Sequence, residues 1–310
     1  MLTETKLIEL LEQHHKSAVI LCAYKLGIFS ETITPQTISE IADKTDTVVW
    51  KLEVLINTLI ALGLLEKNQE GKYGTVDCAI SSLVSSQESS ITNYCDFLLG
   101  NWNSWSRYDK VFLNNASNQM YQDFSDIAFV EDYYTMQGQT NYEMYGLIAD
   151  QVEIGENAFL VDVGGGDASF VKFLAEKTEN STFEVWDLPH AKDSAQKTIL
   201  NNHLESRVKF QNCSIPLEFP KSDKLVDAIT LINITHHISL SDFEALVIHS
   251  KTLLSASGNI YIGDTFLNET GIEPLGNLLF SNYLMLNNPQ SKVHKICDIV
   301  SILSKHGFKS

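Results

Sequence analysis

The chain has 310 residues, of which 44% are hydrophobic and 20% charged, so it can bury one large or two moderate globular cores. Its formal net charge is −17, and an acidic surface repels phosphate groups, so we expect neither a nucleic-acid nor a membrane partner. The five cysteines are scattered and lack C-x-x-C spacing, which predicts neither a disulfide framework nor a metal site. The N-terminus is unlike a secretory signal and no long apolar run is present, so we expect a cytoplasmic protein with reduced cysteines.

The first hundred residues are predicted to form a helical domain with a small β-hairpin. Apolar residues recur at helical spacing in three segments, and a Gly-containing turn then separates two short strand-like runs. This order is typical of a winged helix. The predicted elements are a helix within 5–29, a short amphipathic helix after a cap-like Thr34-Pro35, a helix that starts at 48 and ends at Gly63, and a hairpin over 66–76.

A winged helix most often binds DNA, and its reading helix should then present basic or amide side chains. Here that helix offers Lys51, Glu53 and Asn57, and residues 1–100 contain seven Lys or Arg against thirteen Asp or Glu. We therefore expect a dimerisation or lid module. A winged-helix regulator that senses a small metabolite stays open as an alternative.

Residues 101–310 are predicted to form a second domain of the α/β class. Residues 101–156 form a helical segment rich in aromatic residues and Met, most of them core and the remainder candidates for an apolar ligand pocket. Short apolar strands then alternate with amphipathic helices, which indicates a parallel sheet covered by helices on both faces. The predicted strands are AFLVDVG (158–164), TFEVWDL (182–188), RVKFQN (207–212), VDAITLINI (226–234) and GNIYIGD (258–264).

Three glycines join the first of these strands to its helix. Gly164, Gly165 and Gly166 permit a sharp turn and the close approach of a ligand at the carboxyl edge of the sheet. Asp167 at the start of the helix repels phosphate, and Asp187 at the end of the next strand can accept hydrogen bonds from ribose hydroxyls. The predicted ligand is a nucleoside without phosphate and with a positive centre, which fits S-adenosyl-L-methionine better than NAD.

With these residues the chain resembles the plant-type small-molecule O-methyltransferases, which include caffeate, isoflavone and hydroxyindole methyltransferases. The resemblance implies a class I methyltransferase with a Rossmann-like sheet, a small-molecule substrate from secondary metabolism, and a homodimer formed through the N-terminal winged-helix domain. It rests on VDVGGGDAS, VWDLP, RVKFQNCSIP, DAITLINITHH and LLSASGNIYIGD in that order, and on SAVILCAYKLGIF, ISEIAD, LINTLIALGLLEK and KYGTV in the first domain.

The resemblance also implies residue roles. His236 would be the general base and Asp264 the acid that orients it, because imidazole can take a phenol proton near neutral pH. The cofactor would be held by Gly164, Gly165, Gly166, Asp187, Leu188, Ser214, Ile215 and Asn233. The candidates for substrate contact are Trp105, Met136, Phe280, Tyr283, Met285 and Asn288.

The chain departs from the family pattern at several positions. The second carboxylate beside the histidine is replaced by Val293, and the run His236-His237-Ile238 makes His237 a rival base. The family continues with two more strands after HGFKS, so the Rossmann-like core over 157–310 is expected to lack them. Ala168 also stands for the third glycine, and Cys213-Ser214 for a Gly-Asp pair. O-methylation is expected, with N- or C-methylation or a non-methylating use of the cofactor left open.

Overall fold

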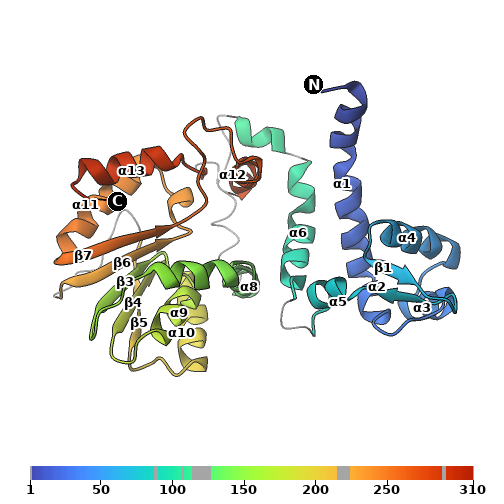
Figure 1. Cartoon of the computed structure of the whole chain (residues 1–310), viewed down its shortest axis with the longest axis horizontal. Helices are drawn as coiled ribbons and strands as arrows, with labels where there is room; N and C mark the ends of the chain where they lie inside the picture. The colour runs from blue at the N-terminus through green and yellow to red at the C-terminus, as the bar shows by residue number, and fades with distance from the viewer. Residues whose placement is uncertain are drawn as a thin grey trace. The chain divides into compact units, whose positions relative to one another are not determined.

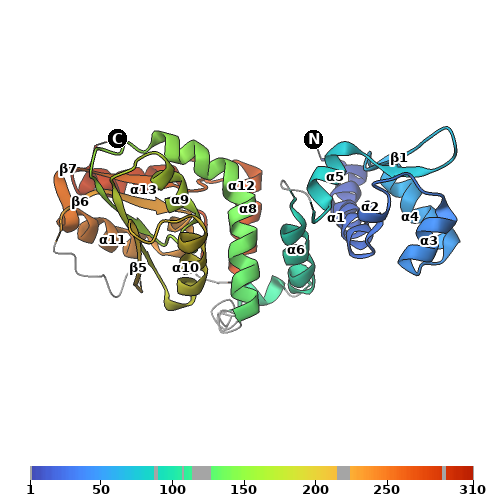
Figure 2. The ribbon, with the colours of Figure 1, turned by 90° about the horizontal axis from the view of Figure 1, so that it is seen from below.

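The computed structural model describes residues 2–86, 90–106, 108–113, 127–214, 224–287 and 291–309, with the backbone alone at 127–136, 138–139 and 287. The chain divides into two compact units, Met1–Trp102 and Asn103–Ser310. Figures 1 and 2 show the helices and strands of each unit.

The N-terminal unit has the predicted order of helices and hairpin. Strands β1 and β2 pair antiparallel, with Glu66 opposite Gly74. The elements are α1 (Glu4–Lys25), α2 (Ile28–Glu31), α3 (Ile38–Thr45), α4 (Val49–Ala61), β1 (Leu65–Lys67), β2 (Tyr73–Thr75), α5 (Asp77–Leu83) and α6 (Thr92–Trp105), the last of which continues into the second unit.

The expected cap at Thr34-Pro35 is wrong by three residues. Helix α3 begins after Thr37, whose hydroxyl accepts from the Glu40 N–H at 3.3 Å while the Glu40 carboxylate accepts from the Thr37 N–H at 2.7 Å. This reciprocal pair satisfies two N–H groups that the helix itself leaves unpaired, which Thr34 is too far along the chain to do.

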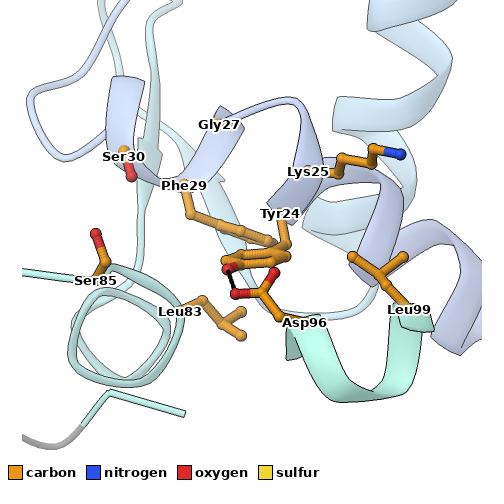
Figure 3. Close-up of a pocket in the computed structure, with 9 residues that line it drawn as sticks. All are labelled: Tyr24, Lys25, Gly27, Phe29, Ser30, Leu83, Ser85, Asp96 and Leu99. Carbon is orange, nitrogen blue, oxygen red and sulfur yellow. Dashed lines mark hydrogen bonds between the residues drawn. The ribbon is translucent and has the colours of Figure 1, made fainter. Parts of the chain in front are cut away.

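A pocket of about 350 Å³ lies within the N-terminal unit (Figure 3). Tyr24 at the end of α1 donates a hydrogen bond to the Asp96 carboxylate of α6 at 3.0 Å across it. Burial and this bond to a carboxylate raise the pKa of Tyr24. The contact ties α6 to α1, and none of the predicted cofactor, catalytic or substrate residues lines the pocket.

The first turns of α1 carry apolar residues on the surface of the chain. Every residue from 2 to 17 is exposed. Large apolar side chains lie among them: Leu7 is 46%, Ile8 48%, Leu10 54% and Leu11 67% exposed. Leaving so many aliphatic groups in water is unfavourable, so this stretch of α1 is suited to cover by another surface.

The second unit is built on a five-stranded parallel sheet in the order β5-β4-β3-β6-β7. The expected start of the last strand is wrong by four residues, because a register shift between Val226 and Ala228 lets β7 begin at Leu254. The elements are η1 (Tyr108–Phe112), α8 (Ile127–Gln151), β3 (Phe159–Val163), α9 (Ser169–Glu176), β4 (Thr182–Asp187), η2 (Pro189–Ala191), α10 (Lys192–Asn201), β5 (Val208–Asn212), β6 (Val226–Ile232), η3 (Thr235–His237), α11 (Leu240–Leu253), β7 (Leu254–Gly263), α12 (Leu275–Asn287) and α13 (Ile296–Lys305).

Helices cover both faces of this sheet, as the continuous apolar strands predict. On one face, residues of α8, α9 and α10 form a buried cluster with the strands, and on the other face residues of α11 and α13 do the same. Chain order reverses at β3, which lies between β4 and β6. In such sheets a crevice opens at the carboxyl ends of these strands. Among the described residues no helix is long and apolar enough to cross a lipid bilayer.

Candidate active site

The glycine turn follows β3 at the carboxyl edge of the sheet. Gly164 and Gly166 have φ values of 72° and 54°, which favour glycine. A Cβ on Gly164 would lie 2.7 Å from the Ile234 Cδ1, and one on Gly165 would lie 2.5 Å from the Asp162 Oδ2. A side chain at either position would collide, so the turn brings bare backbone to the crevice, where a ligand can approach it closely.

Ala168 occupies the left-handed region that the family pattern gives to a third glycine. Its φ is 65°, it directly precedes α9, and it is 2% exposed. An L-residue in this region is less stable than glycine by about 1–2 kcal/mol. Alanine in place of glycine at position 168 therefore introduces backbone strain beside the glycine turn, and the turn itself keeps its conformation.

Asp187 ends β4 and faces the turn. Its Oδ2 accepts a hydrogen bond from the Gly166 N–H at 2.7 Å, and its Oδ1 accepts from the Leu188 N–H at 2.6 Å. Burial raises the pKa of Asp187 to about 6, against the effect of these two bonds. Each carboxylate oxygen has a second lone pair. The half-buried group can therefore also accept from ligand hydroxyls.

Two further carboxylates lie beside the turn. Asp162 is 2% exposed; its Oδ1 accepts from the Thr230 hydroxyl at 2.6 Å, and its Oδ2 has no partner among the described residues. Burial, aided by the charges of Asp187 and Asp167, raises the pKa of Asp162 to about 7 against the lowering effect of the Thr230 bond. Burial also raises the pKa of Asp167, which accepts from the N–H and the hydroxyl of Ser169. Three closely spaced acids favour a cationic ligand and disfavour a phosphate.

The remaining cofactor candidates lie at the same edge. Leu188 follows β4, Ser214 lies just after β5, and Asn233 follows β6, all half-buried. The Asn233 N–H donates to the Gly263 carbonyl at 2.8 Å and extends the pairing of β6 with β7. Ile215 lies outside the described residues. This edge of the sheet therefore offers bare backbone at the glycine turn, an acid able to bind ribose and further carboxylates nearby. These features fit a nucleoside that carries a sulfonium.

His236 lies in η3, directly after β6, and contacts Asp264 at the end of β7. Its Nδ1 is 2.6 Å from the Asp264 Oδ1, and both side chains are buried, 5% and 0% exposed respectively. Because a carboxylate can only accept, Nδ1 carries the hydrogen and Nε2 presents its lone pair. This is the arrangement that prepares an imidazole to act as a base.

Asp264 is held by several donors besides His236. Its Oδ2 accepts from the Thr235 hydroxyl at 2.6 Å and the Thr235 N–H at 2.9 Å, and its Oδ1 accepts from the Thr265 N–H at 2.7 Å. Burial acts to raise the pKa of Asp264, but the hydrogen bond and charge of His236 and the bonds from Thr235 and Thr265 outweigh it and hold that pKa below its usual range. The acid is therefore an ionised anchor for the ring.

His237, the rival base, has different surroundings. Its ring lies 4.2 Å from the His236 ring, centroid to centroid, and the described contacts include no hydrogen bond from this ring to Asp264. Burial, together with repulsion from His236, lowers the pKa of His237 to about 3 against the attraction of Asp264. A ring so resistant to protonation is a poor acceptor of a substrate proton, so the geometry favours His236.

The segment that leads into η3 and the glycine turn are in contact, because Ile234 lies against Gly164. Two of the substrate candidates lie near His236. The Phe280 ring of α12 meets the His236 ring edge-on at 5.3 Å, and Tyr283 stacks on Phe280 at 6.3 Å. Two aromatic rings of α12 therefore lie beside His236.

The other substrate candidates are placed less directly. Trp105 is 43% exposed and packs on Tyr108, which donates a hydrogen bond to Asn282 of α12. Met285 is half-buried on α12. The Met136 side chain and Asn288 lie outside the described residues.

Val293 leaves His236 with one acidic neighbour. It packs with Leu267 and Leu284 in an apolar cluster, and the adjacent Lys292 N–H donates to the His236 carbonyl at 3.0 Å. In the described part of the chain Asp264 is the carboxylate that contacts the ring, and no cluster of metal-binding side chains is present there.

Two residues of this site were missed by sequence reasoning. An acid within the apolar strand FLVDV was a usable signal for Asp162, since buried carboxylates are rare unless they serve a purpose. Thr235 gave no such signal, because a threonine at a strand end is ordinary.

Comparison with known proteins identifies similar chains. A family model described as an O-methyltransferase domain matches residues 111–309, and one described as an O-methyltransferase dimerisation domain matches residues 8–84. A curated human protein, described as a probable bifunctional dTTP/UTP pyrophosphatase/methyltransferase protein, is 28% identical over 204 residues. The match covers 60% of this chain and 32% of that protein, so the chain spans about a third of the relative's length.

Solved structures share the fold. An O-methyltransferase family protein from Burkholderia thailandensis superposes with a TM-score of 0.90 at 21% identity, covering 100% of this chain and 94% of that one. Human N-acetylserotonin methyltransferase in complex with SAM superposes with a TM-score of 0.82 at 17% identity, covering 98% and 91%.

Proposed function

The chain belongs to the O-methyltransferase family, whose enzymes depend on S-adenosylmethionine, and on that premise we propose that it methylates a hydroxyl group of a small aromatic or polyketide-like metabolite, with His236 as the general base. The observation that carries this proposal is the buried contact between His236 and Asp264, on a loop that touches the glycine turn through Ile234. A base next to a cofactor cradle is what hydroxyl methylation requires.

When bound, S-adenosylmethionine supplies an electrophilic methyl group. Gly164, Gly165 and Gly166 would accommodate it against bare backbone, and Asp187 would accept hydrogen bonds from its ribose. The carboxylates beside the turn would stabilise the positive charge of the sulfonium.

His236 would then deprotonate the acceptor. A phenol is a weak nucleophile until its proton is removed, and the Nε2 lone pair is available to take it. The Asp264 carboxylate fixes the ring and stabilises the imidazolium that forms. Phe280 and Tyr283 give the acceptor an apolar face, which favours an aromatic substrate.

The test is methyl transfer from labelled S-adenosylmethionine to a panel of phenols, aromatic amines and polyketide-like compounds. His236→Ala should lower kcat by about 100-fold or more and leave cofactor affinity unchanged, since general bases contribute about 10²–10⁴. His237→Ala is the matched control and should have a much smaller effect. Full activity of the His236 variant, or label on nitrogen or carbon alone, would contradict the proposal.

We also infer a homodimer formed through the N-terminal unit. The matched dimerisation domain and the exposed aliphatic residues of α1 support it. Light scattering after size exclusion should give twice the chain mass. Leu7→Glu with Leu11→Glu should shift the protein towards monomer, whereas Gln13→Glu on the same exposed stretch should not. A wild-type monomer at micromolar concentration would contradict the inference.

A further inference from the structure

We propose that the Thr235 hydroxyl is a positioning group for the base: it holds one oxygen of Asp264 so that the other oxygen faces His236. The inference deepens the proposed function and rests on the role of His236 given there. Thr235 would touch neither substrate nor cofactor and would act through Asp264.

The contacts around the carboxylate divide cleanly between its two oxygens. The Oδ1 accepts from His236 Nδ1 at 2.6 Å and from the Thr265 N–H at 2.7 Å. The Oδ2 accepts from the Thr235 hydroxyl at 2.6 Å, its N–H at 2.9 Å and the His236 N–H at 3.3 Å. The hydroxyl makes the shortest of the three bonds on the Oδ2 side and, within the described residues, the one that comes from a side chain.

Within the described part of the chain, the Thr235 hydroxyl has Asp264 as its hydrogen-bond partner and no competing one. Thr235 is 1% exposed, and burying a hydroxyl is unfavourable unless it is hydrogen-bonded. Valine would fill the same space without that requirement. Among the described residues, the hydroxyl donates its hydrogen bond to Asp264.

The position of the carboxylate matters more here than in a site with two acids. Val293 takes the place of a second carboxylate and packs in an apolar cluster, so Asp264 is the one carboxylate of the described residues that orients the His236 ring. Among the described residues the other neighbours of the ring are His237, which stays neutral, and the edge of Phe280, and neither carries the negative charge with which the carboxylate holds the Nδ1 hydrogen. If the Asp264 carboxylate rotated, the His236 ring would lose the hydrogen bond that fixes its orientation.

Removing the hydroxyl has an electrostatic consequence as well. The Thr235 bond is one of the interactions that lower the pKa of Asp264, because it stabilises the negative charge. Without it the carboxylate binds the proton shared with His236 more tightly. The pair therefore needs a higher pH to free the base.

The test compares Thr235→Val, which keeps shape and N–H groups, with Thr235→Ser, which restores the hydroxyl. The valine variant should lower kcat about tenfold, the effect of one hydrogen bond to a charged group. KM for S-adenosylmethionine should not change, and the acid limb of the kcat profile should move to higher pH. The serine variant should recover the wild-type kcat and the wild-type position of the acid limb. Thr32→Val, which removes a buried threonine hydroxyl from the N-terminal unit, should leave the pH profile unchanged.

A second measurement needs no acceptor. Histidine ¹⁵N NMR of the S-adenosylhomocysteine complex should show the titration midpoint of the His236–Asp264 pair move upward in Thr235→Val and return in Thr235→Ser. Should the valine variant not fold, Thr235→Ala removes the same hydroxyl. Wild-type kcat and pH profile in the valine variant, or a serine variant that recovers neither, would overturn the inference. A fully active His236→Ala would overturn the proposed function itself, which is a distinguishable result.

Discussion

Asp162 should make the free energy of unfolding fall as the pH rises. Its carboxyl is 2% exposed, one of its oxygens is unpartnered, and its pKa is raised from 3.8 to about 7. The unfolded chain therefore loses this proton at lower pH than the folded chain does. Stability is unaffected below the unfolded pKa, is lost progressively between the two values, and is constant above about pH 7.

The magnitude follows from the width of that interval. Each pH unit within it corresponds to about 1.4 kcal/mol, so the full interval amounts to about 4 kcal/mol, of which about 3 kcal/mol falls between pH 5 and 7. Other groups titrate in the same range, His237 and Asp187 among them, so the wild-type curve alone does not isolate Asp162.

The assay is urea denaturation without cofactor at several pH values, comparing wild type with Asp162→Asn. The asparagine keeps an oxygen for the Thr230 hydroxyl, and any fixed effect of its NH₂ is independent of pH. The stability of the variant relative to wild type should rise by about 3 kcal/mol from pH 5 to 7 and then level off. Asp187→Asn is the control, because the Asp187 pKa is raised less. The difference in free energy of unfolding between this variant and wild type should level off near pH 6.

A difference in free energy of unfolding between wild type and Asp162→Asn that stays constant from pH 5 to 7 would refute the reasoning. It would mean that the carboxyl is ionised at pH 5 in the fold, and hence that an interaction absent from the described contacts stabilises its charge.

Three further outcomes are expected at the glycine turn. S-adenosylmethionine should bind more tightly at pH 8 than at pH 5.5 in calorimetry, because Asp162 and Asp187 become charged in between, and neutral S-adenosylhomocysteine should show a much smaller change. Gly165→Ala should lower the free energy of unfolding by about 1–3 kcal/mol and weaken cofactor binding, because its Cβ would lie 2.5 Å from the Asp162 Oδ2. Gly155→Ala is the control: its Cβ would have no atom within 4 Å, so its free energy of unfolding should stay within about 0.5 kcal/mol of wild type. Asp187→Ala should weaken cofactor binding by about 1.5–3 kcal/mol, and an unchanged Kd would rule out its role in binding ribose.

The sequence predicted the sheet well because its signals are local. Apolar runs in the parallel strands, the Gly164–Gly166 turn and an acid ending the next strand are all legible one segment at a time. Errors arose where two neighbours could serve equally. Thr34 and Thr37 both precede α3, and only the reach of Glu40 decides between them.

The choice of the proposed base between His236 and His237 shows the same limit. His236 and His237 are adjacent, so spacing cannot separate them, and the choice depends on which ring the turn of η3 brings to Asp264. The division of donors between the two oxygens of Asp264 likewise depends on the path of three segments in space. No periodicity encodes it, and this is why Thr235 escaped notice.

The contact between Ile234 and Gly164 bears on how such an enzyme could acquire new substrates. A bulkier residue at 234 would push directly into the cradle, so the loop that carries the base has little freedom to vary. Helix α12 carries Phe280 and Tyr283, the aromatic residues that lie beside the proposed base. Diversification of acceptor choice should therefore accumulate along α12, while the donor half of the crevice stays fixed.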